Sequence, residues 1–433
     1  MKCVLKNKKI TNNYVENLLK ERGIIKTEDE YEHFLNPTSS DLIEPKKLDN
    51  MEEGFNLLMK HIKEGNRILI VVDPDVDGFT SASLMWLYLK ENFSDYNFTL
   101  EVKLPQGKEH GFRTIVNDFE NEDLCDLILM PDAGSNDFKE HKTLKELGYD
   151  ILVIDHHSCD EGYSEDAVVI NNQLSKDYDN KYLSGAGVVY KFLQYCDKKL
   201  NIHSADNHID VVTAGIVIDM MNITSLENRY IITQGCKRIT NEFLKELCMK
   251  TSIKKTEELT LDDFSFYIGP AINALIRIGS DVDKANLFNA LTVGEKIVLS
   301  NKKGHAENEK ETLASQIARR CINIKNAQKK EQEKAAEELN IQISNECLDD
   351  NKILIVNCDD IDVNRNLTGL IAMTLSKKYK KPVLLGRLNK NREFKGSGRG
   401  LSGTELTDFR QFLLDSNLME FSQGRLALNI FTI

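Results

Sequence analysis

From residue 67 onward, short apolar runs alternate with stretches whose apolar residues recur with helical spacing. This alternation is typical of a parallel α/β sheet with covering helices. The expected strands cover residues 68–72, 98–104, 126–130, 151–154 and 168–170, and the expected helices between them cover 81–92, 112–121 and 138–147. Residues 1–65 are polar with periodic leucines, and we expect a helical cap there.

The second half of the chain predicts a connecting helix and then a smaller α/β unit. A long charged stretch over 293–341 has almost no Gly or Pro, which favours an exposed helix. Beyond it, strands are expected at 353–357, 382–386 and 393–399, with a helix at 367–377. We therefore expect four parts, namely a cap (1–65), a large α/β domain (66–290), a connecting helix (291–345) and a small α/β domain (346–433).

Acidic and imidazole side chains follow three of the expected strands. They are Asp73, Asp75 and Asp77 after the first strand, Asp132 after the third, and Asp155, His156 and His157 after the fourth. Because open parallel sheets bind ligands at the carboxyl ends of their strands, we expect these side chains to share one site.

Carboxylates gathered in one place repel each other, so the cluster indicates a bound hard cation. The run Asp73–Gly78 resembles the start of an EF-hand loop, but such a loop needs Glu at its twelfth position. That position is Leu84, and an expected strand precedes the run, so an EF-hand is excluded. A mixed Asp and His set favours Mn²⁺ or Mg²⁺ over zinc, and two such ions form the usual centre for phosphodiester hydrolysis.

Composition and charge narrow the class of protein. The net charge of −12 argues against a nucleic-acid partner, yet residues 372–400 hold nine Lys or Arg and a single acid. This segment could bind phosphates, although a solvated lysine-rich helix explains part of it equally well. The nine cysteines are scattered without pairs, and we see neither a secretory signal nor a membrane span, so we expect a cytoplasmic protein.

Four of these segments resemble the motifs of a known family. VVDPDVDGFTS, LMPDAG, VIDHHS and AGIVIDMM are similar to the four motifs of the DHH phosphoesterases. LSGAGVVYKF, LENRYIITQG, IGPAINALIRIG, LTGLIAMTLSKKYKKPVLL and KGSGRG narrow the resemblance to the RecJ-type exonucleases, which are specific for single strands. The resemblance implies an α/β fold in which a parallel-sheet DHH domain and a smaller DHHA1 domain are joined by a long helix.

The resemblance also implies roles for single residues. Metal ligation is expected of Asp73, Asp75, Asp77, Asp132, His156 and Asp219. Asp132 would bridge two ions, Asp155 would orient a neighbouring group, and His157 would contact the scissile phosphate. From the residues alone, Asp219 is either a paired or metal-bound acid in an apolar segment, or an acid at a surface-exposed helix end.

Substrate contacts are implied for Asn273 and Arg277, and for Ser397, Gly398 and Arg399 in the GSGRG motif. We expect this motif to be a loop whose glycines let backbone amides approach an anion, with Arg399 binding it bidentately.

The sequence departs from the family pattern in three places. The Gly-Gly-His motif of the DHHA1 domain corresponds to residues 423–427 and lacks the histidine. The chain ends at Ile433, so we expect no C-terminal oligonucleotide-binding domain. The segment around His110-Gly111-Phe112 resembles an altered Glu-Gly-Tyr-Gly element.

These observations predict a Mn²⁺- or Mg²⁺-dependent exonuclease that digests single-stranded DNA, 5′ to 3′ as the resemblance implies, in DNA repair or recombination. A single-strand-binding protein or helicase is a possible partner. Two alternatives stay open, namely a phosphodiesterase for short oligonucleotides or cyclic dinucleotides, and a catalytically weakened relative that only binds nucleic acid.

Overall fold

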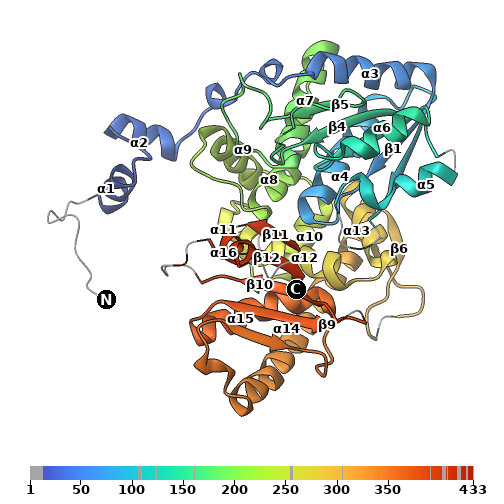
Figure 1. Ribbon diagram of the computed structural model, residues 1–433. Helices are drawn as coiled ribbons and strands as arrows, with labels where there is room; N and C mark the ends of the chain where they lie inside the picture. The colour runs from blue at the N-terminus through green and yellow to red at the C-terminus, as the bar shows by residue number, and fades with distance from the viewer. Residues whose placement is uncertain are drawn as a thin grey trace. The chain divides into compact units, whose positions relative to one another are not determined.

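The computed structural model describes residues 13–105, 107, 110–121, 124–159, 161–253, 257–304, 306–390, 392–401, 406, 408–416, 421–425 and 428–432. Its contacts divide the chain into two units, Met1–Ile276 with Ser280–Arg320, and Arg277–Gly279 with Cys321–Ile433. Each unit contains its own five-stranded sheet (Figure 1).

The first unit begins with helices and continues into a sheet with alternating helices. Its strands are β1 (Arg67–Val71), β2 (Thr99–Lys103), β3 (Leu127–Pro131), β4 (Asp150–Asp155) and β5 (Val168–Asn171). The helices up to the last of these strands are α1 (Tyr14–Glu21), α2 (Glu28–Leu35), α3 (Met51–Glu64), α4 (Val76–Asn92), α5 (Val116–Asn121) and α6 (Phe138–Glu146), with 3-10 turns η1 (Ser39–Asp41), η2 (Pro45–Lys47) and η3 (Phe112–Thr114).

A second group of helices follows the sheet. They are α7 (Gly185–Leu200), α8 (Ile209–Ile218), α9 (Leu226–Lys237), α10 (Glu242–Lys250), α11 (Leu261–Asp263), α12 (Gly269–Ile278) and α13 (Asp281–Val293), with the 3-10 turn η4 (Ala205–His208) and the π-helix η5 (Phe264–Ile268).

The sheet of the first unit has the order β2-β1-β3-β4-β5, and every neighbouring pair is parallel. The predicted α/β class and all five predicted strands are confirmed. The chain leaves β1 toward β2 on one side and returns through β3 toward β5 on the other. The boundary between β1 and β3 is therefore the topological switch point, where open α/β sheets bind ligands.

Helices cover both faces of this sheet, which explains why β1, β3, β4 and β5 are mainly apolar, whereas the edge strand β2 alternates apolar and polar residues. On one face, Leu69 and Val71 of β1 pack with Phe112, Ile115 and Phe119 from η3, α5 and the residue between them. On the other face, α3 lies so close that a Cβ at Gly54 would touch Ile170 of β5, Leu152 of β4 and Phe192 of α7. Glycine at position 54 therefore permits the close approach of α3 to the sheet.

The long charged stretch forms a helix only from Leu313. α14 spans Leu313–Asn345, and before it β6 (Ile297–Leu299) and β7 (Lys310–Thr312) form an antiparallel hairpin. The expectation of a helix from residue 291 is wrong at this end, because the consecutive β-forming residues Ile297–Leu299 of β6 pair with β7 across a connection that contains Gly304 at φ +79°. The helix is also not exposed throughout, since a stripe that includes Ala314, Ala318 and Leu339 is buried.

The second unit contains a mixed sheet of order β11-β12-β10-β9-β8. Its elements are η6 (Leu348–Asp350), β8 (Leu354–Asn357), η7 (Arg365–Leu367), α15 (Thr368–Tyr379), β9 (Val383–Leu388), β10 (Phe394–Arg399), α16 (Phe409–Asp415), β11 (Phe421–Arg425) and β12 (Leu428–Thr432). Only β8 and β9 pair in parallel. Apolar residues of α14 and α15 pack on one face, and Phe409 and Leu413 of α16 pack against Leu384 of β9.

Two further expectations concern the chemistry of the whole chain. The eight cysteines in the described part are all free, as expected, and Cys3 lies outside it. Among the described helices, none is long and apolar enough to span a bilayer.

His141 of α6 makes stability depend on pH. Its ring is fully buried beside Phe112, and neither ring nitrogen has a hydrogen-bond partner among the described residues. Burial lowers the pKa of His141 from 6.5 to about 4. Between pH 6.5 and pH 4, His141 is therefore protonated in the unfolded chain and neutral in the folded one. His141 thus destabilises the fold increasingly as the pH falls through this range.

Between pH 7 and pH 5, we expect burial of His141 to lower the free energy of unfolding of the wild type by about 2 kcal/mol. This decrease should be absent in His141→Leu. Urea unfolding of both proteins at the two pH values measures this difference. An equal loss in His141→Leu and the wild type would contradict the prediction.

Candidate metal centre

The acids of the first motif are placed by the end of β1 and the start of α4. Asp73 follows β1 and is buried, Asp75 is the N-cap of α4, and Asp77 lies in its first turn. Asp75 Oδ1 accepts a hydrogen bond from the Gly78 N–H at 2.9 Å. A Cβ at Gly78 would overlap the backbone of Asp73, so the tight turn that gathers the three carboxylates requires glycine there.

Asp132 follows β3 in a strained backbone conformation. Its φ is +75°, and its N–H donates to Ile154 O of β4 at 2.8 Å. Few non-glycine residues adopt such a φ, although Asp and Asn do so more readily than most. This conformation holds the carboxylate at the switch point, with only 1% of the residue exposed.

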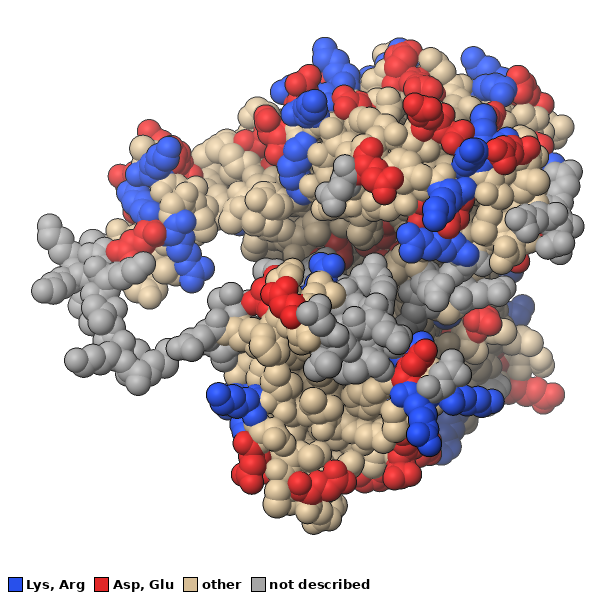
Figure 2. Space-filling model, in the orientation of Figure 1, with Lys and Arg blue, Asp and Glu red and all other residues tan. Residues whose placement is uncertain are grey.

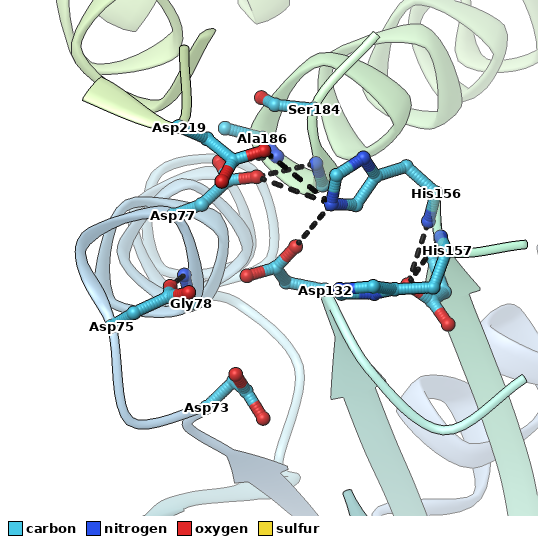
Figure 3. Close-up of polar contacts among 12 residues, drawn as sticks. Asp73, Asp75, Asp77, Gly78, Asp132, His156, His157, Ser184, Ala186 and Asp219 are labelled. Atoms are coloured by element: carbon cyan, nitrogen blue, oxygen red, sulfur yellow. Dashed lines mark hydrogen bonds and ion pairs between the residues drawn. The ribbon is translucent and has the colours of Figure 1, made fainter. Parts of the chain in front are cut away.

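Three of the predicted carboxylate ligands converge on one imidazole nitrogen, which belongs to a fourth predicted ligand (Figure 3). His156 Nε2 lies 3.4 Å from Asp132 Oδ1, 3.8 Å from Asp219 Oδ2 and 3.9 Å from Asp77 Oδ2. Asp219 is the C-cap of α8 and is only partly exposed. The structure thus brings Asp219, distant in sequence, to the same edge as the motifs that follow β1, β3 and β4.

The start of α7 holds Asp77 in place. The N–H groups of Gly185 and Ala186 donate to its two oxygens at 2.6 and 3.0 Å. A Cβ at Gly185 would overlap Asp132, so this glycine allows the helix to approach two carboxylates at once. We predicted no role for the segment LSGAG in holding the acids; its glycines preceding a helix were the available signal, because helix N-termini favour anions.

Asp155 orients the two histidines that follow it. Its Oδ1 accepts the His157 ring N–H at 2.8 Å and the His156 backbone N–H at 2.6 Å, and its Oδ2 accepts the Ser135 N–H at 3.0 Å. Burial opposes ionisation, but the charge of His157 and these hydrogen bonds lower the pKa of Asp155 below its usual range. In return, the charge of Asp155 raises the pKa of His157 to about 10.

For three other carboxylates, burial outweighs the contacts that favour ionisation. Burial raises the pKa of Asp73 to about 6, and burial together with neighbouring carboxylates raises the pKa of Asp77 and of Asp132. Asp132 Oδ1 is buried and accepts no hydrogen bond from any residue that the structure describes. A cation among these oxygens would satisfy them, so the donor set fits bound metal.

Three groups of side chains within the described part are spaced to hold such ions. They are Asp77, His156 and Asp219; Asp132, His156 and His157; and Asp73, Asp75 and His110, with the possible ligand atoms of each group within 4.8 Å of one another. His110 was not among the predicted ligands. The sequence shows that His110 belongs to an altered family element, but no local pattern indicates that its side chain contacts Asp73.

The predicted substrate contacts lie on other elements. Asn273 and Arg277 are four residues apart on α12 and so lie on one side of that helix. Burial, and then the charge of Arg277, lower the pKa of Arg399 to about 10. The charge of Arg277 thus acts on Arg399, and both arginines belong to the second unit.

The expected GSGRG loop is instead a central strand. Ser397, Gly398 and Arg399 belong to β10, which pairs with β9 on one side and with β12 on the other. Because both neighbours occupy its backbone hydrogen-bonding positions, the amides of this segment are not presented to an anion. The side chain of Arg399 therefore remains as the group of this strand that could bind an anion. Its guanidinium lies against Gly369 of α15, where a Cβ would overlap it.

Comparison with known proteins shows the family to which this chain belongs. The family model "DHH family, N-terminal domain" matches residues 67–216. YorK, named as a single-strand DNA-specific exonuclease from the SPbeta prophage of Bacillus subtilis, is 37% identical over 412 residues, which cover 94% of this chain and 69% of YorK. The chain belongs to the DHH family.

Other DHH relatives carry the name RecJ. The single-stranded-DNA-specific exonuclease RecJ of Haemophilus influenzae is 25% identical over 388 residues, which cover 86% of this chain and 64% of that protein. RecJ of Thermus thermophilus in complex with Mn²⁺ has the same fold, with a TM-score of 0.70 at 18% identity, covering 93% of this chain and 54% of that one. This DHH chain therefore spans only about half to two thirds of the length of these RecJ proteins.

Proposed function

We propose that this protein is a metal-dependent exonuclease that hydrolyses phosphodiester bonds of single-stranded DNA. The observation that carries the proposal is the convergence of Asp77, Asp132, Asp219 and His156 at the switch point of the sheet (Figure 3). The similarity to YorK, which covers nearly the whole chain, supports the same reaction and substrate. Mn²⁺ or Mg²⁺ suits this mainly carboxylate donor set.

In the proposed centre, Asp132 would bridge two ions, with Asp77, Asp219 and His156 on one side and Asp73 and Asp75 on the other. Bound ions would supply a hydroxide at neutral pH and neutralise charge on the scissile phosphate. The amides of Gly185 and Ala186 hold Asp77 toward the centre, so α7 keeps this ligand oriented.

His157 is the proposed contact to the scissile phosphate. Asp155 accepts a hydrogen bond from the Nδ1–H of His157 and keeps the ring positively charged, while half of the His157 side chain remains exposed. The Nε2 N–H of His157 is therefore available to donate to a phosphate oxygen. A charged donor held at this edge would bind a phosphate that is losing its leaving group.

Charged groups on the first unit do not form one basic field on the face drawn in Figure 2, where Lys and Arg are interspersed with Asp and Glu. We infer that single placed residues bind the DNA backbone, with Asn273, Arg277, Ser397, Gly398 and Arg399 as the proposed contacts. Because the backbone amides of β10 are paired on both sides, Ser397 and Arg399 would make the contact through their side chains, and Gly398 would contribute only by having none.

The finer features of the function are proposals as well. We propose digestion from the 5′ end, a role in DNA repair or recombination in the cytoplasm, and cooperation with a single-strand-binding protein or helicase. We also propose that residues 66–290 carry the DHH centre, 346–433 form the DHHA1 domain, 291–345 connect them, and 1–65 form a cap.

One digestion experiment tests the main proposal. With Mn²⁺ present, we expect the protein to degrade a 5′-labelled single strand several tens of nucleotides long, releasing labelled mononucleotide first, and to spare a blunt duplex. The same strand labelled at the 3′ end should lose its label last. Turnover of a dinucleotide without digestion of the long strand would favour the short-oligonucleotide alternative, and binding without cleavage would favour the non-catalytic one.

A further inference from the structure

His110 lies against the metal centre although it belongs to none of its motifs. Its Nδ1 contacts Asp73 Oδ2, and the next N–H, that of Gly111, donates to Asp73 Oδ1 at 3.3 Å. The imidazole side chain is 55% exposed, whereas the Asp73 side chain is fully buried. The ring thus covers this carboxylate from the solvent side.

The backbone around His110 is anchored to the core, so this position is built into the fold. Gly111 has φ +75°, and a Cβ there would overlap Asp137 Oδ2. That same oxygen accepts the Phe112 N–H at 2.8 Å. Phe112 is completely buried, with its ring centroid 5.1 Å from that of His141. Gly111, where no larger residue fits, and the buried ring of Phe112 therefore fix the backbone position of His110.

The atoms near Asp73 have the spacing of a metal site. One ligand atom each from Asp73, Asp75 and His110 lies within 4.8 Å of the others. Two ligands on opposite sides of one ion, each bound at about 2.2 Å, are separated by about 4.4 Å, so a small movement would let the three share an ion. The group also has the same composition as Asp77, Asp219 and His156, two carboxylates with one imidazole.

We propose that His110 is a ligand, through Nδ1, of the ion held by Asp73 and Asp75. This inference rests on the proposed two-ion centre and adds a nitrogen donor to its second position. Imidazole suits the later transition metals and is a poor donor for Mg²⁺. A nitrogen ligand here would make this position prefer Mn²⁺ to Mg²⁺.

Substitutions at residue 110 separate a ligand from a residue that only hydrogen-bonds Asp73. Asp and Asn both place a polar atom close to the position of His Nδ1. Asp offers an anionic oxygen that binds Mn²⁺ but donates nothing to Asp73, whereas Asn keeps a donor and is a weak ligand. Because the His110 side chain is half exposed, neither variant should disturb folding.

Equilibrium dialysis of the full chain against Mn²⁺ tests the proposal. We expect the wild type to bind two ions, His110→Asn to bind one of them at least about tenfold more weakly, and His110→Asp to bind that ion more tightly than His110→Asn. As a control, His33 also pairs with an aspartate, through Nε2 to Asp41 at 2.7 Å, and His33→Asn should bind both ions like the wild type.

The outcomes distinguish this inference from the proposed function. Wild-type-like binding of both ions by His110→Asn, or weaker binding by His110→Asp than by His110→Asn, would overturn the role of His110 and leave the two-ion centre standing. A wild-type protein that binds fewer than two ions would overturn the centre itself, and the role of His110 with it.

Discussion

Asp132→Asn is expected to lower the rate of single-strand cleavage in Mn²⁺ on the order of 10³-fold, since a bridging carboxylate contributes several kcal/mol. The substitution removes the charge and keeps the shape. Asn tolerates the φ of +75° at this position, so the fold should be retained. Neighbouring carboxylates repel Asp132, and the thermal midpoint in a chelator should therefore equal or exceed that of the wild type.

Single-turnover cleavage of a 5′-labelled strand measures the rate, and fluorescence anisotropy measures DNA binding, which should change little. Asp150→Asn is the matched control, because Asp150 lies at the start of β4, the strand whose other end carries Asp155. Its partners are Lys60, His61 and Lys145, so it should lose some stability and keep its cleavage rate. Cleavage by Asp132→Asn at a rate near the wild type would refute the bridging role.

Gly185→Ala is expected to weaken Mn²⁺ binding by about 100-fold, although it leaves every proposed ligand residue unchanged. A Cβ at residue 185 would overlap the Asp132 carboxylate, while the N–H of the same residue donates to Asp77. Either Asp132 or the start of α7 must move, and both movements displace a ligand. Overpacking of this kind also costs about 1–3 kcal/mol of stability.

Gly187→Ala provides the control two residues further along α7. The three atoms nearest to a Cβ there all belong to the side chain of Leu183 and none to a proposed ligand, so Mn²⁺ affinity should stay near that of the wild type. Equilibrium dialysis and thermal unfolding measure both variants. If Gly185→Ala and Gly187→Ala bind Mn²⁺ equally well, close packing of α7 against the carboxylates is not required for the site.

Local patterns predicted most of the first unit. β1, β3, β4 and β5 are short, mainly apolar runs, and a strand buried on both faces shows this directly in its composition, whereas the edge strand β2 shows the alternation of a half-exposed strand. The acids could be assigned to one site because parallel strands place their carboxyl ends along the same edge. Gly78 stands beside the acids that it brings together, so its role can be read from the motif. Gly185 is far in sequence from Asp77 and Asp132, so its role cannot be read in this way.

Predictions failed where pairing between distant segments decides the conformation. Residues 297–299 and 310–312 lie within the charged stretch for which a helix was expected, yet they form the β6–β7 hairpin. The segment GSGRG has the glycines of a loop, yet β9 and β12 on either side make it a central strand. Backbone pairing outweighs local propensity in both cases, because strand formation depends on neighbours as well as on the residues themselves.

The sequence by itself identified the family and the residues that we propose to carry the chemistry, namely the acids after β1 and β3 and the Asp155-His156-His157 triplet. Only the tertiary structure decided what surrounds them. Gly185 donates to Asp77 across 108 positions of sequence, and His110 contacts Asp73 across 37. The physical reason is that ligand types are properties of residues, whereas a close approach depends on how helices and loops pack against the sheet.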